Sequence, residues 1–500
     1  MTMTERAEEQ PARNRQPRWR KQDIAADFGA SLVVFLVAVP LCVGIAVASG
    51  VPAELGIVTG IVGGIVVGLL PGSSLQVSGP AAGLTVLVAD AVSRHGLPAL
   101  GVIVLGAGLL QIVLGLLRLG EWFRAISPSV VQGMLAGIGL VLLLSQIYPM
   151  TGATQPETTA DKVLGLANLV TDALTQPAAM LVGLLTIATI LGWQRMPAKV
   201  RLVPGALIAV VLASAVTALV GLPVATVEVG GLTSVLGGLG GHDWGLLTDP
   251  AVLGSVLTFA LVASAESLFS AAAVDRMHDG PPTRYNAELV AQGVGNTVSG
   301  VLGALPMTAV IVRSAANVQA GARTRASRVM HGVWLLVFAV LLPGLLALVP
   351  LAALAALLMH AGWKLLEIPR LIALARTNRP EAAVVLITAG TIAAVDLLVG
   401  VLVGLGVAIT KTAWDVSHLS VSTTSTAEGV HVMLRGTATF LRLPRLLQLL
   451  RSVPSAPRTE LDLTGLRHLD QACLQAVEQW ASERRRETGR VHVMLPIQAS

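Results

Sequence analysis

The chain has 500 residues, of which 54% are hydrophobic and only 13% are charged. A soluble domain carries about 25% charged residues, so this composition excludes an ordinary soluble protein and indicates one that spans a membrane. The net charge of +5 does not indicate a nucleic-acid-binding protein, because the basic residues lie in short loops. The two cysteines, Cys42 and Cys473, are too few for a disulfide framework or a metal cluster.

Residues 1–26 are polar and basic, and we expect a cytoplasmic leader there without a cleavable signal peptide. About fourteen apolar segments follow, which predict an all-α polytopic membrane domain over residues 27–414. They are 27–49, 53–70, 80–93, 98–117, 128–148, 177–193, 202–221, 251–273, 285–304, 306–320, 327–348, 350–363, 381–396 and 397–414.

The loop charges support this count of segments. The leader and the loops on its side carry twenty Lys and Arg residues, whereas the other side carries only Arg94 and Lys162. By the positive-inside rule, this asymmetry predicts fourteen spans of the inner membrane with both termini in the cytoplasm. The halves 27–221 and 251–414 each hold seven segments, and an odd number forces them into opposite orientations. The sequence therefore predicts a seven-plus-seven inverted repeat.

The composition changes after the last apolar segment. Residues 415–429 are rich in Ser and Thr and predict a linker. Residues 430–500 alternate between strand and helix patterns, which predicts a small cytoplasmic α/β domain. We expect strands at 431–434, 460–463 and 490–495, and helices at 443–452 and 471–487.

The third apolar segment of each half is short and begins with a proline. Residues Ser78, Gly79, Pro80 and Ala81 open one, and Pro306, Thr308, Ala309 and Val310 open the other. About a dozen residues cannot cross a bilayer core of roughly 30 Å, so we predict two half-length helices with each proline in the first turn. Two facing helix N-termini would present free N–H groups to a small anion. The alternative is that Pro and Gly merely kink two membrane helices.

Two charged residues within apolar segments are the next candidates. Arg313 follows Pro306 by two helical turns and would complement an anionic substrate; the alternative is an arginine that reaches the membrane interface. Glu266 lies in the middle of its segment and would carry a coupling proton, or bind Na⁺ together with Ser270. The alternative for Glu266 is a structural salt bridge to Arg313.

Other polar residues are weaker candidates. Gln292, Asn296 and Asn317 have a spacing typical of hydrogen bonds between membrane helices. His242, Asp243 and Asp249 do not have metal-ligand spacing, so we expect neither a bound metal nor any other cofactor beyond a coupling ion. No nucleophile–base pair is evident, so an enzyme is not expected.

The chain resembles the SulP family of sulfate permeases and anion exchangers over nearly all of its length. The motifs that carry the resemblance are Val39 to Ala46, Ala48 to Pro52, Val77 to Pro80, Pro306 to Arg313, Asn317 and Gly321 to Arg325. The C-terminal stretch Leu461 to Leu466, with Leu469 and Asp470, resembles a STAS domain.

The resemblance implies a core domain, a gate domain, a homodimer and an elevator-like movement of the core. It also implies that Leu41, Ile45, Ala81, Val310, Val312 and Arg313 line the substrate site. Glu266 and Ser270 occupy positions at which sodium-coupled bicarbonate members carry Asp and Thr, and this departure favours a proton over Na⁺. A STAS domain implies a regulatory partner, either a cytosolic protein or a nucleotide.

The sequence therefore predicts secondary active transport or exchange of a small inorganic anion, such as sulfate, bicarbonate or chloride. Four alternatives stay open: a dicarboxylate–proton symporter, a Na⁺-coupled bicarbonate transporter, a nucleobase permease of the same architecture and an anion channel. A receptor or scaffold that acts through the STAS domain is a further rival.

Overall fold

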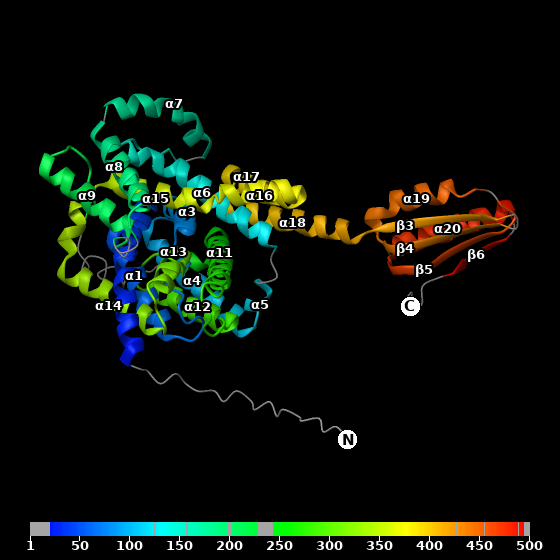
Figure 1. Cartoon of the computed structure of the whole chain (residues 1–500), viewed down its shortest axis with the longest axis horizontal. Coiled ribbons are helices and arrows are strands. Elements are labelled where there is room, and N and C mark those ends of the chain that lie inside the picture. The colour runs from blue at the N-terminus through cyan, green and yellow to red at the C-terminus, as the bar shows by residue number, and fades with distance from the viewer. Residues whose placement is uncertain are drawn as a thin grey trace, which may run out of the picture. The chain divides into compact units, whose positions relative to one another are not determined.

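The computed structural model describes residues 21–123, 127–156, 159–175, 177–197, 200, 203–228, 244–426, 429–454, 456–488 and 490–494. The chain divides into two compact units, residues 1–402 and 403–500 (Figure 1). The first unit is almost entirely helical, and in its described residues the second contains most of the last apolar helix, a four-stranded sheet and two further α-helices. Most of the predicted leader and the candidates His242 and Asp243 lie outside the described residues.

Each predicted apolar segment coincides with a helix, because an unbroken apolar stretch must satisfy its backbone hydrogen bonds internally. The helices at these positions are α1 (Lys21–Ala48), α2 (Ala53–Val62), α3 (Thr85–His95), α4 (Leu97–Leu116), α6 (Pro128–Met150), α8 (Pro177–Trp193), α9 (Gly205–Val220), α11 (Pro250–Val274), α12 (Tyr285–Val301), α13 (Ile311–Gln319), α14 (Ala326–Leu341), α15 (Leu351–Leu365), α17 (Arg379–Ala394) and α18 (Leu397–Val416). Among the described residues of the first unit, three further α-helices were not predicted: α5 (Gly120–Phe123), α7 (Thr159–Thr175) and α16 (Ile368–Thr377).

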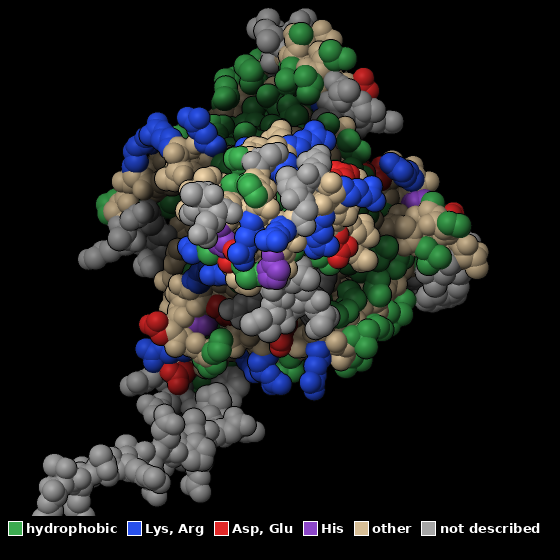
Figure 2. Space-filling model, turned by 90° about the vertical axis from the view of Figure 1, so that its right-hand side faces the viewer, with side chains coloured by type: hydrophobic (Ala, Val, Ile, Leu, Met, Phe, Trp, Pro, Cys, Tyr) green, Lys and Arg blue, Asp and Glu red, His purple; other side chains and the backbone are tan. Residues whose placement is uncertain are grey.

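The first unit is a helical membrane domain. Within the described residues, six helices are long and apolar enough to cross a bilayer, and four shorter apolar helices accompany them. Large apolar side chains remain exposed on these helices, for example Leu219 on α9 and Leu341 on α14. Figure 2 shows such apolar side chains gathered in patches, as a surface that faces lipid requires.

Glycines allow the helices to approach one another closely. A Cβ atom added at Gly108 of α4 would lie 2.4 Å from the backbone nitrogen of Thr297 on α12. A Cβ at Gly64, in the π-helical turn Gly63–Val67 that extends α2, would lie 2.5 Å from the Cα of Gly332 on α14. These helices therefore pack backbone against backbone, which in lipid replaces the hydrophobic driving force available in water.

The second unit is the predicted α/β domain. Its sheet has the order β3-β4-β5-β6, with β3 antiparallel to β4 and the other neighbours parallel. Alternate residues such as Val432, Leu461 and Leu463 are buried in the core beneath the helices. The elements are β3 (Leu419–Thr426), β4 (Gly429–Ala438), α19 (Leu443–Ser452), β5 (Thr459–Leu469), α20 (Gln471–Thr488) and β6 (Val491–Met494).

The prediction of an irregular linker over residues 415–429 was wrong. Helix α18 continues to Val416, and Leu419–Thr426 forms β3, paired with β4 over eight residues. Threonine and valine are β-branched and favour extended backbone, and an edge strand tolerates polar side chains on its open face. The Ser and Thr residues that suggested a linker therefore belong to an edge strand.

Candidate functional site

Two three-residue strands from opposite halves of the membrane unit pair with each other. Strand β1 (Ser78–Pro80) is antiparallel to β2 (Met307–Ala309), with Ser78 opposite Ala309 and Pro80 opposite Met307. The N–H of Val310 extends the pairing by donating to the carbonyl of Val77 at 2.9 Å. The structure thus brings together the two proline-containing stretches, which are more than 220 residues apart in sequence.

Each strand leads directly into a helix start. After β1 come Ala81 and a 3-10 turn, Ala82–Leu84, which leads into α3; after β2 comes Val310, followed by α13. Because the strands are antiparallel, the two segments that lead into the helices leave the ribbon at opposite ends. At about 3.4 Å per residue, the three-residue ribbon separates these two exits by on the order of 10 Å.

The prediction that each proline occupies the first helical turn was wrong. Pro80 is the last residue of β1, and Pro306 precedes β2. Proline has no N–H, so it fits the end of a short strand, where no ladder hydrogen bond is lost. At the caps, Ala81 and Val310 are extended and have no side chain that accepts from the helix. Amide groups at both helix starts therefore have no side-chain cap, as an anion site requires.

Buried polar side chains fix the ribbon from behind. Asn296 accepts from the N–H of Met307 at 2.7 Å and donates to its carbonyl at 3.1 Å. Ser267 accepts from the N–H of Ala309, and Ser314 accepts from the N–H of Val77. These contacts satisfy backbone groups that lipid and apolar side chains cannot satisfy. The ribbon is therefore a rigid platform for the two helix starts.

Arg313 lies behind the ribbon and not at the membrane surface. Its side chain has 0% exposure, and one guanidinium nitrogen donates to the carbonyl of Pro80 at 3.4 Å. A Cβ atom at Gly79 would lie 2.2 Å from Nη1 of Arg313, so the guanidinium packs directly against the β1 backbone. Its neighbour Val312, on another face of α13, is 49% exposed. Nε and Nη1 of Arg313 have no hydrogen-bond acceptor in the described part of the chain.

Glu266, on α11, faces the other helix start. A Cβ atom at Gly83, in the turn before α3, would lie 2.7 Å from one carboxylate oxygen of Glu266. The second carboxylate oxygen is buried without a hydrogen-bond partner in the described residues, and the carboxylate interacts with the Thr308 side chain. No ion pair joins Glu266 to Arg313 among the described residues. Ser270, one turn further along α11, is buried.

The remaining predicted residues line the apolar side of the ribbon. Leu41, Ile45 and Ala81 belong to one buried cluster that also contains residues of α6 and α15, such as Met134 and Leu358. The structure therefore brings α1 and the α3 tip together against α6 and α15. Val310 is half-buried at the start of α13.

Sequence reasoning missed a buried ionic network beside the ribbon. Glu288 accepts from the N–H of Ser73 at 2.8 Å and from the amides of Gln76 and Gln292. Gln292 also donates to the hydroxyl of Ser78 at 2.7 Å. Arg328, 2% exposed, donates to the carbonyls of Gly68 and Leu70, which follow the π-helical turn. A glutamate within the apolar segment 285–304 was the available signal for this network.

Among the described residues, no group of three His, Cys, Asp or Glu side chains is arranged to hold a metal ion. The geometry is therefore that of a small polar site built from backbone amides, one buried cation and one buried carboxylate. Such a site can hold a small anion and a proton or monovalent cation, and it contains no activated nucleophile.

Comparison with known proteins gives three consistent findings. The model of the sulfate permease family matches residues 24–388. YvdB of Bacillus subtilis, described as a candidate sulfate transporter, is 30% identical over 396 residues, which cover 77% of this chain and 72% of that protein. The bicarbonate transporter BicA of Synechocystis is 28% identical over 312 residues, or 59% of this chain and 53% of that protein.

Two solved structures share the fold. The transmembrane domain of a cyanobacterial bicarbonate transporter, BicA, matches with a TM-score of 0.67 and 24% identity, covering 78% of this chain and 98% of that one. The murine anion transporter Slc26a9 matches with a TM-score of 0.75 and 16% identity, covering 96% of this chain and 86% of that one.

Proposed function

The chain belongs to the sulfate permease family, and from that premise we propose that it carries a small inorganic anion of the sulfate, bicarbonate or chloride class by secondary active transport or exchange. The observation that carries this proposal is the β1–β2 ribbon. Two helices begin just after its strands, and neither helix start has a side-chain cap. Family members transport anions and are not enzymes, which agrees with the absence of an activated nucleophile from this site.

The anion binds between the helix starts, with backbone N–H groups from the α3 and α13 termini as its donors. Ala81, Val310 and Val312 are small or apolar there, and Leu41 and Ile45 of α1 cover the site. Arg313 does not contact the anion in this arrangement. Its buried charge acts through the β1 backbone, in a low dielectric where water screens it little.

Glu266 is the coupling residue in this proposal. Its carboxylate lies at the start of α3 and there competes with an anionic substrate for the positive end of the helix dipole. Protonation of Glu266 removes that competing charge, so the anion and a proton bind together. Ser270 lies on the same helix, and with Glu266 it forms the alternative Na⁺ site.

The wider architecture follows from the same reasoning. We propose fourteen spans arranged as a seven-plus-seven inverted repeat, with both termini cytoplasmic in the inner membrane. The core carries the ribbon, the gate includes α6 and α15, and elevator-like movement of the core alternates access to the site. The protein is a homodimer in this proposal, and its second unit is a STAS domain that binds a regulatory cytosolic protein or nucleotide.

Uptake by proteoliposomes tests the proposal. The purified protein is expected to accumulate labelled sulfate or bicarbonate, and an inward proton gradient is expected to increase the initial rate. Glu266→Gln, which mimics the protonated carboxyl, should retain uptake but lose its dependence on the gradient.

Glu478→Gln is the matched control, because Glu478 is exposed on α20 of the second unit. This variant should respond to the gradient as the wild type does. Unchanged gradient dependence in Glu266→Gln would remove Glu266 from the coupling step. Failure of the wild type to accumulate any of these anions would contradict the transport proposal itself.

A further inference from the structure

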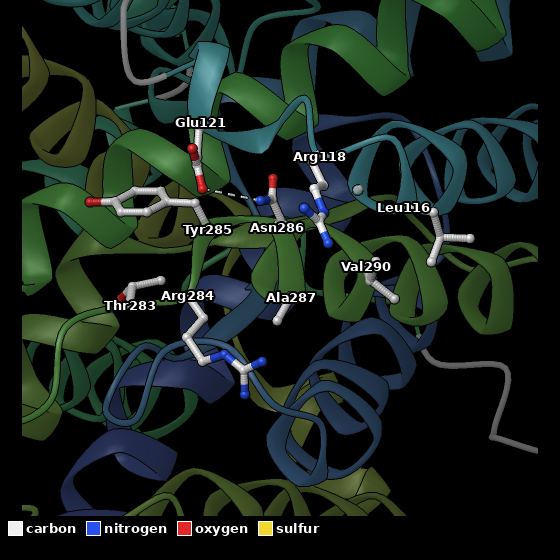
Figure 3. A pocket seen from close by; sticks show the side chains of 10 residues that line it. Leu116, Arg118, Glu121, Thr283, Arg284, Tyr285, Asn286, Ala287 and Val290 are labelled. Atoms are coloured by element: carbon white, nitrogen blue, oxygen red, sulfur yellow. Dashed lines mark hydrogen bonds between the residues drawn. The ribbon is translucent and has the colours of Figure 1, made fainter. Parts of the chain in front are cut away.

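A pocket lies apart from the ribbon, between the end of α4 and the start of α12 (Figure 3). Its volume is about 470 Å³. The transport proposal above uses none of its residues. The pocket is lined by Gly115, Leu116, Arg118, Glu121, Thr283, Arg284, Tyr285, Asn286, Ala287 and Val290.

Two exposed arginines flank this pocket. In the view of Figure 3, Ala287 lies between the guanidinium groups of Arg118 and Arg284. Neither guanidinium has a hydrogen-bond acceptor or an ion-pair partner among the residues that the structure describes. The carboxylate of Glu121 is engaged by the Asn286 amide, which donates to it at 3.3 Å. Glu121 stays a charged carboxylate in the pocket lining, but neither arginine pairs with it, so the two cations outnumber the one anion that faces a ligand.

The backbone at Arg118 is unusual. Its φ of 61° makes it one of two non-glycine residues with positive φ in the described chain. It follows the last turn of α4, where the N–H of Leu119 closes the helix by donating to the carbonyl of Leu114 at 3.0 Å. Glycine is the usual residue at this position because it adopts a left-handed conformation without strain. Here an arginine occupies it and projects a guanidinium into the pocket.

An apolar stripe runs along α4 to the same pocket. Leu109, Val113 and Leu116 follow one another at helical spacing and are 48%, 48% and 69% exposed. Helix α4 is one of the six helices that can cross a bilayer. Because Leu116 both ends the stripe and lines the pocket, hydrocarbon lying along α4 would bring its polar end between the two arginines.

We propose that this pocket binds the headgroup of an anionic phospholipid, with its phosphate between Arg118 and Arg284 and its acyl chains along α4. Guanidinium groups bind phosphate oxygens by paired, charge-assisted hydrogen bonds. The adjoining stripe favours a lipid over free phosphate, since only a lipid uses both the cations and the exposed leucines. The pocket is formed by α4, α5 and α12, so a bound lipid would contact all three helices and stabilise their packing near the ribbon.

Native mass spectrometry of the purified full-length protein tests this proposal, with phosphatidylglycerol and phosphatidylcholine titrated separately. The wild type should prefer phosphatidylglycerol, and each arginine should account for about fivefold in affinity. Arg118→Gly and Arg284→Gln should each lower the affinity by that factor, and the double variant should lose the preference. Arg118→Gly also relieves the positive φ, so its loss of lipid binding cannot be ascribed to unfolding.

Arg376→Gln is the matched control, because it removes an exposed arginine of α16 that lies outside the pocket. It should bind phosphatidylglycerol as the wild type does. Equal retention of phosphatidylglycerol by the double variant and the control would overturn the proposal. Displacement of the lipid by inorganic phosphate alone would also overturn it, since a free anion would then be a sufficient ligand.

Discussion

At the scale of single residues, Arg313 places a buried positive charge directly behind the ribbon. Its guanidinium is wholly buried, yet no carboxylate pairs with it in the described chain and two of its nitrogens have no acceptor. A buried cation without an anionic partner is costly and persists only where the surrounding structure holds it in place. Gly79 provides that constraint, because its missing side chain is what lets the guanidinium lie against the ribbon.

Gly79→Ala therefore tests whether the position of the Arg313 charge matters for transport. The new Cβ would lie 2.2 Å from Nη1 and must displace the guanidinium. We expect initial uptake to fall by about tenfold, which corresponds to about 1.4 kcal/mol. Arg313→Ala should lower uptake at least as far. In the Arg313→Ala background, adding Gly79→Ala should cost little, because the clashing nitrogen is absent.

Gly254→Ala is the control for this cycle, since a Cβ at that position of α11 meets no atom within 4 Å. It should transport at the wild-type rate. Strictly additive losses from Gly79→Ala and Arg313→Ala would show that Gly79 acts independently of the guanidinium.

At the scale of elements, the helices were predictable and the ribbon was not. Long apolar stretches such as 177–193 match their helices within a residue or two, since lipid leaves the backbone no alternative to internal hydrogen bonding. Strands β1 and β2 have three residues each, too few to show the alternation by which a strand is recognised. Their pairing joins residues more than 220 positions apart, and no local pattern reports such a contact.

The amphipathic helix α7 was missed for a related reason. It is not apolar enough for a membrane span, and the search for spans therefore left its residues in a loop, although Gly152, Pro156 and Pro177 are turn signals on either side of it. The charged candidates were easier to single out, because a charge within an apolar segment is conspicuous in any sequence. What the sequence could not show was direction, namely that Arg313 points behind the ribbon while Glu266 points at the α3 start.

Asn296 tests whether the ribbon depends on its side-chain supports. Asn296→Ala leaves both the N–H and the carbonyl of Met307 without their partner, in a buried position. Since each orphaned group costs about 1–3 kcal/mol, we expect a clearly lower unfolding temperature in detergent. Asn296→Asp should not restore stability, because its carboxylate keeps the acceptor for the Met307 N–H but faces the Gln111 and Met307 oxygens that now accept from the Asn296 amide.

Thr391→Ala is the reference for that measurement, because the Thr391 hydroxyl is exposed on α17 and donates only to the Ile387 carbonyl of its own helix. It should unfold at the wild-type temperature. If Asn296→Ala has the same unfolding temperature as Thr391→Ala, then the ribbon is held by its own strand pairing and by packing alone.

At the scale of the whole molecule, the two units have separate cores. The main cluster of the membrane unit and the cluster of the second unit have no residue in common. Each unit contains one cysteine, Cys42 in α1 and Cys473 in α20, and both side chains are fully buried. The two thiols therefore report separately on the unfolding of the two units.

Thiol labelling of the full-length protein in detergent, at increasing urea, should show two transitions. Burial raises the pKa of the Cys473 thiol to about 12, and only the thiolate reacts, so labelling of the folded state should be much slower than labelling of the unfolded chain. Above the ordinary thiol pKa of 9.0, an unfolded chain releases this proton and the folded one retains it. The second unit should therefore lose stability between pH 9.0 and about 12.

The order of the two transitions follows from the size of the cores. The second unit spans residues 403–500 and the first residues 1–402, and a smaller domain buries a smaller fraction of its surface, so the second unit should unfold first. Cys473, followed in a Cys42→Ala variant, should become reactive at a urea concentration where Cys42, followed in a Cys473→Ala variant, stays protected. Coincident labelling midpoints would mean that the units unfold cooperatively and that the second unit contributes directly to the stability of the membrane unit.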